Sequence, residues 1–152
     1  MAMKVVVNPT WRCQLHCIYC WMHGLGFKPG QERSTREWLW FLAQLPQPLS
    51  VDFSGGEPLL YEGIIGLIRG LTLRDIGWAM TTNLVDKRMV NELANARLGN
   101  CMGIHVSAHA GIDASFYERA GKLAAAGYPI TINVVDHPGA GVVPPGVHVA
   151  LI

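Results

Sequence analysis

Charged residues are unusually few in this chain, and this is its most informative shortage. Only 15% of its 152 residues are Asp, Glu, Lys or Arg, whereas 50% are hydrophobic, and the formal net charge is +1. The few cations form no cluster, so the sequence lacks the electrostatic footprint of a nucleic-acid-binding protein. No apolar run reaches the roughly 18 residues that a membrane-spanning helix needs. We therefore expect no membrane association, and strands that are buried on both faces of a parallel sheet.

Cysteine is also scarce, and its distribution is uneven. Three of the four cysteines, Cys13, Cys17 and Cys20, follow one short apolar segment closely. The chain shows no signal peptide and no secreted-type cysteine framework, so we expect retained thiols and a cytoplasmic protein. Clustered thiolates bind a soft metal centre more readily than they pack as core residues. Two sites remain open at this point: structural zinc with His23 as fourth ligand, or an iron–sulfur cluster with one free coordination position.

A pair of glycines follows the next apolar segment. Residues 49–53 predict a strand, and Gly55, Gly56, Glu57 and Pro58 come directly after it. Glycines at the end of a strand let a ligand approach the backbone closely. The carboxylate of Glu57 suits an ammonium group, and the proline fits the first turn of a following helix. Such a turn is weak evidence alone, but here it follows the cysteines by one strand–helix unit.

Patterns typical of strands and helices alternate along the chain. Strands are predicted over residues 5–8, 49–53, 78–82, 104–107, 130–135 and 147–152, and helices over 35–45, 58–70, 86–98 and 113–127. This alternation predicts an α/β fold with a parallel sheet and helices outside it. The notable segments fall at carboxyl ends of strands, where such folds place their active sites. We expect a partial, laterally open barrel of five or six β/α units.

The length favours one domain. We expect residues 1–152 to form this single core domain, with 137–146 as a loop rich in proline and glycine. Residues 147–152 would be its last strand.

In their order, the motifs resemble those of the radical S-adenosylmethionine (radical SAM) enzymes. The most specific are the cysteine spacing Cys13-x3-Cys17-x2-Cys20, with Tyr19 before the last cysteine, and the run from Gly55 to Pro58. Three weaker strings follow at later strand ends, namely Thr81-Thr82-Asn83, Ser107-Ala108-His109 and Asn133-Val134-Val135. The resemblance therefore extends over nearly the whole chain, and it implies a radical SAM core domain without an auxiliary cluster domain.

The resemblance implies two cofactors, a 4Fe–4S cluster and SAM. One electron from the cluster would cleave the sulfonium of SAM and yield a 5′-deoxyadenosyl radical, which would abstract a hydrogen atom from an unidentified peptide or small molecule. An external donor of the flavodoxin or ferredoxin type would supply the electron. Two alternatives stay open: a cluster- and SAM-binding subunit or activating enzyme that needs a partner protein, and a structural zinc module.

The resemblance also implies a role for each motif. The cluster ligands would be Cys13, Cys17 and Cys20. The cofactor-binding residues would be Tyr19 near the adenine, Gly55, Gly56 and Glu57 at the methionyl ammonium with Pro58 beside them, Asn83 and Ser107 at the ribose or carboxylate, and Asn133 and Val135 on the strand that supports the adenine. His109 stands where many relatives carry an acidic residue and is a further candidate. No residue is predicted to act on the substrate itself.

Overall fold

The computed structural model describes residues 3–17, 20, 22, 32–108, 115–134 and 145–151. Their elements are β1 (Met3–Val7), α1 (Thr35–Ala43), β2 (Leu49–Phe53), the 3-10 turn η1 (Pro58–Leu60), α2 (Ile64–Thr72), β3 (Gly77–Thr82), α3 (Lys87–Ala96), β4 (Cys101–Ala108), α4 (Ser115–Ala125), β5 (Ile130–Val134) and β6 (Val147–Leu151). The six strands form one sheet in the order β1-β2-β3-β4-β5-β6. All neighbouring strands are parallel.

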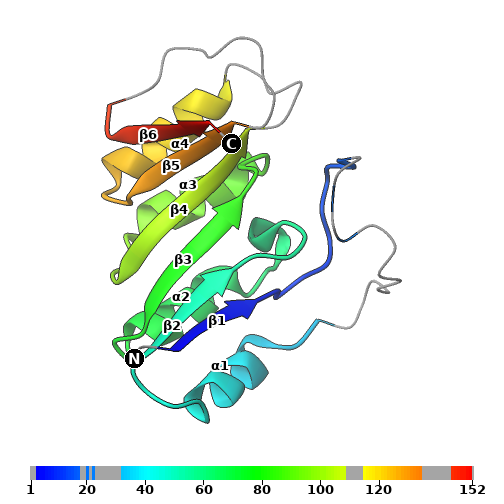
Figure 1. Ribbon diagram of the computed structural model, residues 1–152, viewed down its shortest axis with the longest axis vertical. Coiled ribbons are helices and arrows are strands. Elements are labelled where there is room, and N and C mark those ends of the chain that lie inside the picture. Colours follow the sequence, from blue (N-terminus) through cyan, green and yellow to red (C-terminus); the bar gives the residue numbers. More distant parts are fainter. Residues whose placement is uncertain are drawn as a thin grey trace.

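The sheet order explains where the helices lie. Each strand pairs with the one before it in sequence, and crossovers between parallel strands are right-handed, so successive helices pack on the same face. Figure 1 shows α2, α3 and α4 behind the sheet, which curves from β1 to β6 without closing. The predicted α/β fold, a laterally open partial barrel with helices outside, is confirmed.

The core lies between the sheet and its helices. In β2 the side chains of Leu49, Val51 and Phe53 are buried against the helices, whereas Ser50 and Asp52 alternate with them and are half-buried. This period of two is typical of a strand that is covered on one face. In β3, by contrast, the successive residues Trp78, Ala79 and Met80 are all buried, so both faces are buried there. The expectation of strands buried on both faces therefore holds for the middle of β3 and not for β2.

Local signals set most element boundaries. Ser34 begins α1 with the predicted capping box, because its side chain and that of Glu37 bond each other's backbone N–H groups. The helix expected over 58–70 is divided, since Tyr61 takes an extended conformation between η1 and α2. Asp86 caps α3, which ends at Ala96 before Arg97 adopts a left-handed conformation. Among the described residues, no helix is long and apolar enough to cross a membrane.

Candidate functional site

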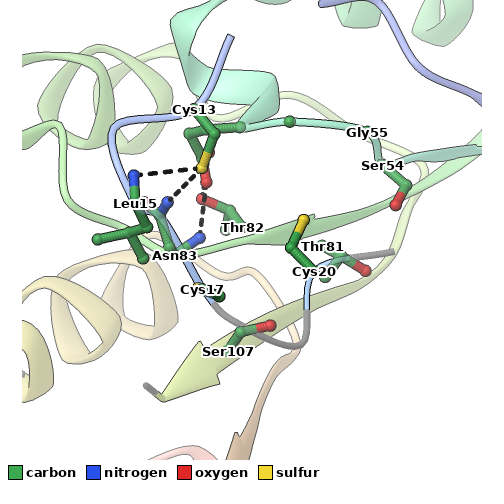
Figure 2. Close-up of a pocket in the computed structure, with 12 residues that line it drawn as sticks. Cys13, Leu15, Cys17, Cys20, Ser54, Gly55, Thr81, Thr82, Asn83 and Ser107 are labelled. Atoms are coloured by element: carbon green, nitrogen blue, oxygen red, sulfur yellow. Dashed lines mark hydrogen bonds between the residues drawn. The ribbon is translucent and has the colours of Figure 1, made fainter. Parts of the chain in front are cut away.

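A pocket opens at the carboxyl ends of the first strands, where segments far apart in sequence meet (Figure 2). Its lining residues are Cys13, Leu15, Cys17, Cys20, Ser54, Gly55, Gly56, Glu57, Thr81, Thr82, Asn83 and Ser107. The cysteine motif, the glycine motif and two of the weaker strings thus converge on one pocket. Its volume of about 210 Å³ is below the ~300–1,000 Å³ of ordinary small-molecule sites.

Backbone hydrogen bonds join the glycine turn, residues 54–57, to the chain that leads into the cysteines. The N–H groups of Ser54, Gly56 and Glu57 donate to the carbonyl oxygens of Val7 (3.0 Å), Thr10 (3.1 Å) and Arg12 (2.7 Å). These bonds continue the pairing of β1 with β2 beyond the ends of both strands. The position of the cysteine segment, residues 13–20, is consequently set by the turn beside it.

The two glycines make room for that leading segment. A Cβ on Gly56 would lie 2.2 Å from the carbonyl oxygen of Arg12, and Gly55 has a φ of +108°. Side chains rarely adopt such a φ, and the oxygen belongs to backbone that is already hydrogen-bonded to the turn. The close approach expected from the sequence is therefore found, but the approaching group is the protein's own backbone.

Glu57 is nearly inaccessible, with 1% of its surface exposed. Its Oε1 accepts hydrogen bonds from Thr82 Oγ1 (2.6 Å) and Leu59 N (3.0 Å), and its Oε2 accepts one from Asn83 N (2.7 Å). Burial raises the pKa of Glu57, while these three hydrogen bonds act in the opposite direction. A carboxylate can accept about four hydrogen bonds. The side chain therefore ties the glycine turn to the end of β3 and has about one acceptor position unused by these three bonds.

The three clustered cysteines are half-buried free thiols. The N–H of Cys20 donates to the carbonyl oxygen of Cys17 (3.0 Å), which closes a tight turn between these two cysteines. Burial raises the pKa of Cys13, whereas the hydrogen bond from Leu15 lowers it. Within the described ranges, no three His, Cys, Asp or Glu side chains are grouped closely enough to hold a metal ion as they stand. The thiols share a pocket, but metal ligation would require them to converge further.

Two N–H groups meet at the sulfur of Cys13, as the dashed lines in Figure 2 show. Leu15 N lies 3.4 Å from Cys13 Sγ, and Asn83 Nδ2 lies 3.8 Å from it. Asn83 was expected to contact SAM, and the structure places it beside a cysteine of the pocket.

A polar cluster at the ends of the segment 12–32 was not predicted from the sequence. Arg12 donates from Nε to Glu32 Oε1 (2.7 Å) and from Nη2 to Glu32 Oε2 (3.0 Å), and the buried Thr10 hydroxyl donates to the same carboxylate. Burial would raise the pKa of Glu32, but the hydrogen bonds from Arg12 and Thr10 outweigh it and lower the pKa. We call Thr10, Arg12 and Glu32 the clasp, because it joins the entry and exit of the segment that carries the cysteines.

Other predicted residues lie elsewhere. Pro58 is buried at the first position of η1 and does not line the pocket. Asn133 on β5 is in register with Ser107 on β4, but only Ser107 lines the pocket. Tyr19, His109 and Val135 lie outside the described residues, as does His23, the proposed zinc ligand.

Some pocket residues were not singled out from the sequence as cofactor-binding. These are Leu15, Ser54, Thr81 and Thr82. All four adjoin a predicted motif or strand end, which is the signal that could have identified them.

A family model described as the radical SAM superfamily matches residues 7–139. PqqA peptide cyclase from Rhodopseudomonas palustris is 31% identical over 153 aligned positions, which cover 89% of this chain and 40% of that protein. GTP 3′,8-cyclase from Pseudomonas fluorescens is 35% identical over 84 positions, covering 51% of this chain and 25% of that protein. The chain thus spans 40% or less of the length of these relatives.

Solved structures with the same fold come from Streptococcus suis SuiB. The structure of SuiB bound to its precursor peptide SuiA superposes with a TM-score of 0.71 at 22% identity, covering 90% of this chain and 34% of SuiB. SuiB bound to S-adenosylmethionine gives a TM-score of 0.70, also at 22% identity, covering 90% of this chain and 35% of SuiB. At this identity the likeness shows the fold.

Proposed function

Because this chain belongs to the radical SAM superfamily, we propose that it is an enzyme that cleaves SAM reductively and abstracts a hydrogen atom from a substrate. One observation carries the proposal: three free thiols and the glycine turn line one pocket at the carboxyl ends of parallel strands. The superfamily uses a 4Fe–4S cluster and SAM as its cofactors. Within this proposal, residues 1–152 act as one core domain.

The donor chemistry of the pocket fits the cluster. Cys13, Cys17 and Cys20 offer soft sulfur ligands, and three ligands leave one iron free to bind a small molecule. When bound, the cluster and SAM would supply the reductive cleavage that yields a 5′-deoxyadenosyl radical. The contribution of this chain is to hold the thiols next to the glycine turn through the bonds from Gly56 and Glu57 to the leading segment.

The glycine turn and the later strand ends would hold SAM. Gly55, Gly56 and Glu57 would receive the methionyl ammonium, for which the carboxylate of Glu57 keeps about one free acceptor position. Ser107, at the end of β4, would contact the ribose or carboxylate. Tyr19, His109, Asn133 and Val135 keep their proposed places near the adenine and ribose, and Pro58 supports the turn from its buried position.

We propose a peptide as the substrate. Relatives named PqqA peptide cyclase align with 89% of this chain, and the SuiB structure was solved with a precursor peptide. A one-electron donor of the flavodoxin or ferredoxin type would serve the cluster, and the thiols suit a reducing cytoplasm.

A second candidate is a cluster- and SAM-binding unit that works only with a partner protein, such as an activating enzyme. The short length of the chain relative to its relatives motivates it, since the match covers 40% of the length of the peptide cyclase relatives. Full turnover of a peptide by a monodisperse monomer would dismiss this candidate. A zinc module fits less well, because the chain belongs to a family that binds an iron–sulfur cluster.

The deciding experiment is anaerobic reconstitution with iron and sulfide, followed by SAM, dithionite and quantification of 5′-deoxyadenosine by mass spectrometry. We expect Cys17→Ala to lose cluster assembly and SAM cleavage together. Cys101→Ala is the matched control, because Cys101 lies on β4, outside the pocket, with a pKa that burial raises to about 11. SAM cleavage retained in Cys17→Ala, or stoichiometric zinc in place of iron and sulfide, would refute the proposal.

A further inference from the structure

The side chain of Asn83 reaches the first cysteine across 70 positions of sequence. It follows β3 and is 6% exposed, so its amide is almost fully removed from water. A buried amide needs partners for both its oxygen and its nitrogen. Its nitrogen, Nδ2, faces Cys13 Sγ at 3.8 Å.

Two donors fix the orientation of this amide. Asn83 Oδ1 accepts hydrogen bonds from the N–H of Val85 (3.0 Å) and from Gln14 Nε2 (3.4 Å). Turning the amide over would place its NH₂ group against both donors and its oxygen against the sulfur. The hydrogen-bond network therefore determines that an N–H group, and not the carbonyl oxygen, faces Cys13.

The backbone of Asn83 is fixed as well. Its N–H donates to Glu57 Oε2 at 2.7 Å, inside the buried network that joins the glycine turn to β3. One residue thus contacts both the turn proposed to bind SAM and a cysteine proposed to bind the cluster. Neither its position nor its side-chain orientation depends on a bound cofactor.

We propose that Asn83 is a positioning residue that raises the reduction potential of the cluster by donating a hydrogen bond to the Cys13 thiolate. This inference rests on the proposed function, and it assigns Asn83 a role in place of the SAM contact expected from the sequence. The reduced cluster carries one more negative charge than the oxidised cluster. An N–H dipole directed at a ligand sulfur stabilises that charge, so reduction by an external one-electron donor becomes easier.

The test compares two substitutions of different chemistry. Asn83→Leu removes the amide at similar volume. Asn83→Asp keeps an oxygen for the N–H of Val85 and directs a second, negatively charged oxygen at the sulfur. The reduction potential is measured without SAM, by anaerobic redox titration of the reconstituted protein with detection of the reduced cluster by electron paramagnetic resonance. Omitting SAM ensures that a lost cofactor contact cannot cause a shift.

We expect the potentials to fall in the order wild type, Asn83→Leu, Asn83→Asp. For Asn83→Leu the ratio of reduced to oxidised cluster at a fixed potential should fall about tenfold, which is about 59 mV for a one-electron couple. Asn91→Leu is the matched control, because it makes the same change on α3, at a residue outside the pocket lining. Its potential should equal that of the wild type.

Unchanged potentials in both Asn83 variants would overturn the inference. If SAM binding weakened in those variants while the potentials stayed constant, Asn83 would be a cofactor contact instead. Loss of the cluster from both variants with unchanged urea midpoints would also overturn it, since Asn83 would then serve assembly. Failure of the wild type itself to assemble a cluster would refute the proposed function, so the two failures are distinguishable.

Discussion

On one side of the pocket Glu57 anchors the glycine turn, since it is 1% exposed and its carboxylate accepts three hydrogen bonds, while Ser54, Gly55 and Gly56 are half-buried. On the other side the cysteine segment carries half-buried thiols. The described contacts hold that segment at its ends through the clasp and along its leading residues through the turn. The difference suits the roles we propose, since a preformed turn can bind a small molecule while ligands that meet around a cluster must be able to converge.

Gly56→Ala should disturb the glycine turn and the cysteine segment together, and it should therefore have the largest effect on stability. The added Cβ would lie 2.2 Å from the carbonyl oxygen of Arg12, and this backbone cannot move without losing its bond to the turn. We expect a loss of more than about 3 kcal/mol in the free energy of unfolding, measured by urea denaturation, because overpacking against rigid atoms is costly.

Gly66→Ala is the matched control for that substitution. Gly66 lies within α2, and its added Cβ would meet only Thr35 Cγ2, at an ordinary 3.7 Å. Alanine in a helix interior should stabilise the protein by about 0.5–1 kcal/mol relative to glycine. If both variants unfolded at similar urea concentrations, the tight contact at Gly56 would not exist in solution.

Glu57→Ala should loosen the glycine turn and leave the clasp intact. The change strands three buried donors, on Leu59, Thr82 and Asn83, and an unsatisfied buried group costs about 1–3 kcal/mol. We expect about 2–3 kcal/mol of lost stability with a reconstituted cluster of normal iron and sulfide content, and weaker SAM binding by equilibrium dialysis. Normal stability in this variant would mean that the carboxylate does not hold the turn to β3, and unchanged SAM affinity would remove Glu57 from cofactor binding.

The sequence predicted that the cysteine segment and the glycine turn would lie side by side. It did not predict the hydrogen bonds that hold each of them in place. The cysteines and the glycine turn follow neighbouring parallel strands, β1 and β2, so their meeting follows from the α/β alternation alone. The partners of Glu57 depend on how far β3 extends beside β2, which local patterns do not specify. The same alternation did not reveal that β2 buries one face fully and the other only in part.

The clasp and the Asn83 amide were beyond sequence reasoning for a different reason. Arg12 and Glu32 are 20 positions apart with the cysteines between them, and Asn83 reaches Cys13 across 70 positions. Contacts of this kind form only when folding brings distant parts of the sequence together, so they leave no periodic pattern in the sequence. Polar residues of ordinary type at unremarkable spacing gave no indication that they would meet at the site.

Arg12→Ala should act mainly on the cysteine segment, although it also removes the hydrogen bond from Arg12 Nη2 to the carbonyl oxygen of Leu60 (2.6 Å). Arg12 is largely exposed, and pairs of this kind contribute up to about 1 kcal/mol, so we expect a small change in the urea midpoint. Cluster assembly should nevertheless slow, measured as iron and sulfide bound per chain at a fixed time of reconstitution. Arg88→Ala removes the exposed Arg88–Glu92 pair of α3, which does not line the pocket, and should leave assembly unchanged. Equal assembly in the two variants would show that the clasp does not position the cysteines.

The clasp also has a pH dependence whose sign can be worked out. The hydrogen bonds from Arg12 and Thr10 lower the pKa of Glu32 in the folded protein below its unfolded value of 4.5. A depressed carboxyl pKa contributes stability above the unfolded pKa, and that stability is lost as the pH falls through the folded pKa. Urea midpoints measured downward from pH 6 should therefore decline less in Glu32→Gln than in the wild type. Parallel curves would mean that Glu32 titrates alike in both states and that the clasp is open in solution.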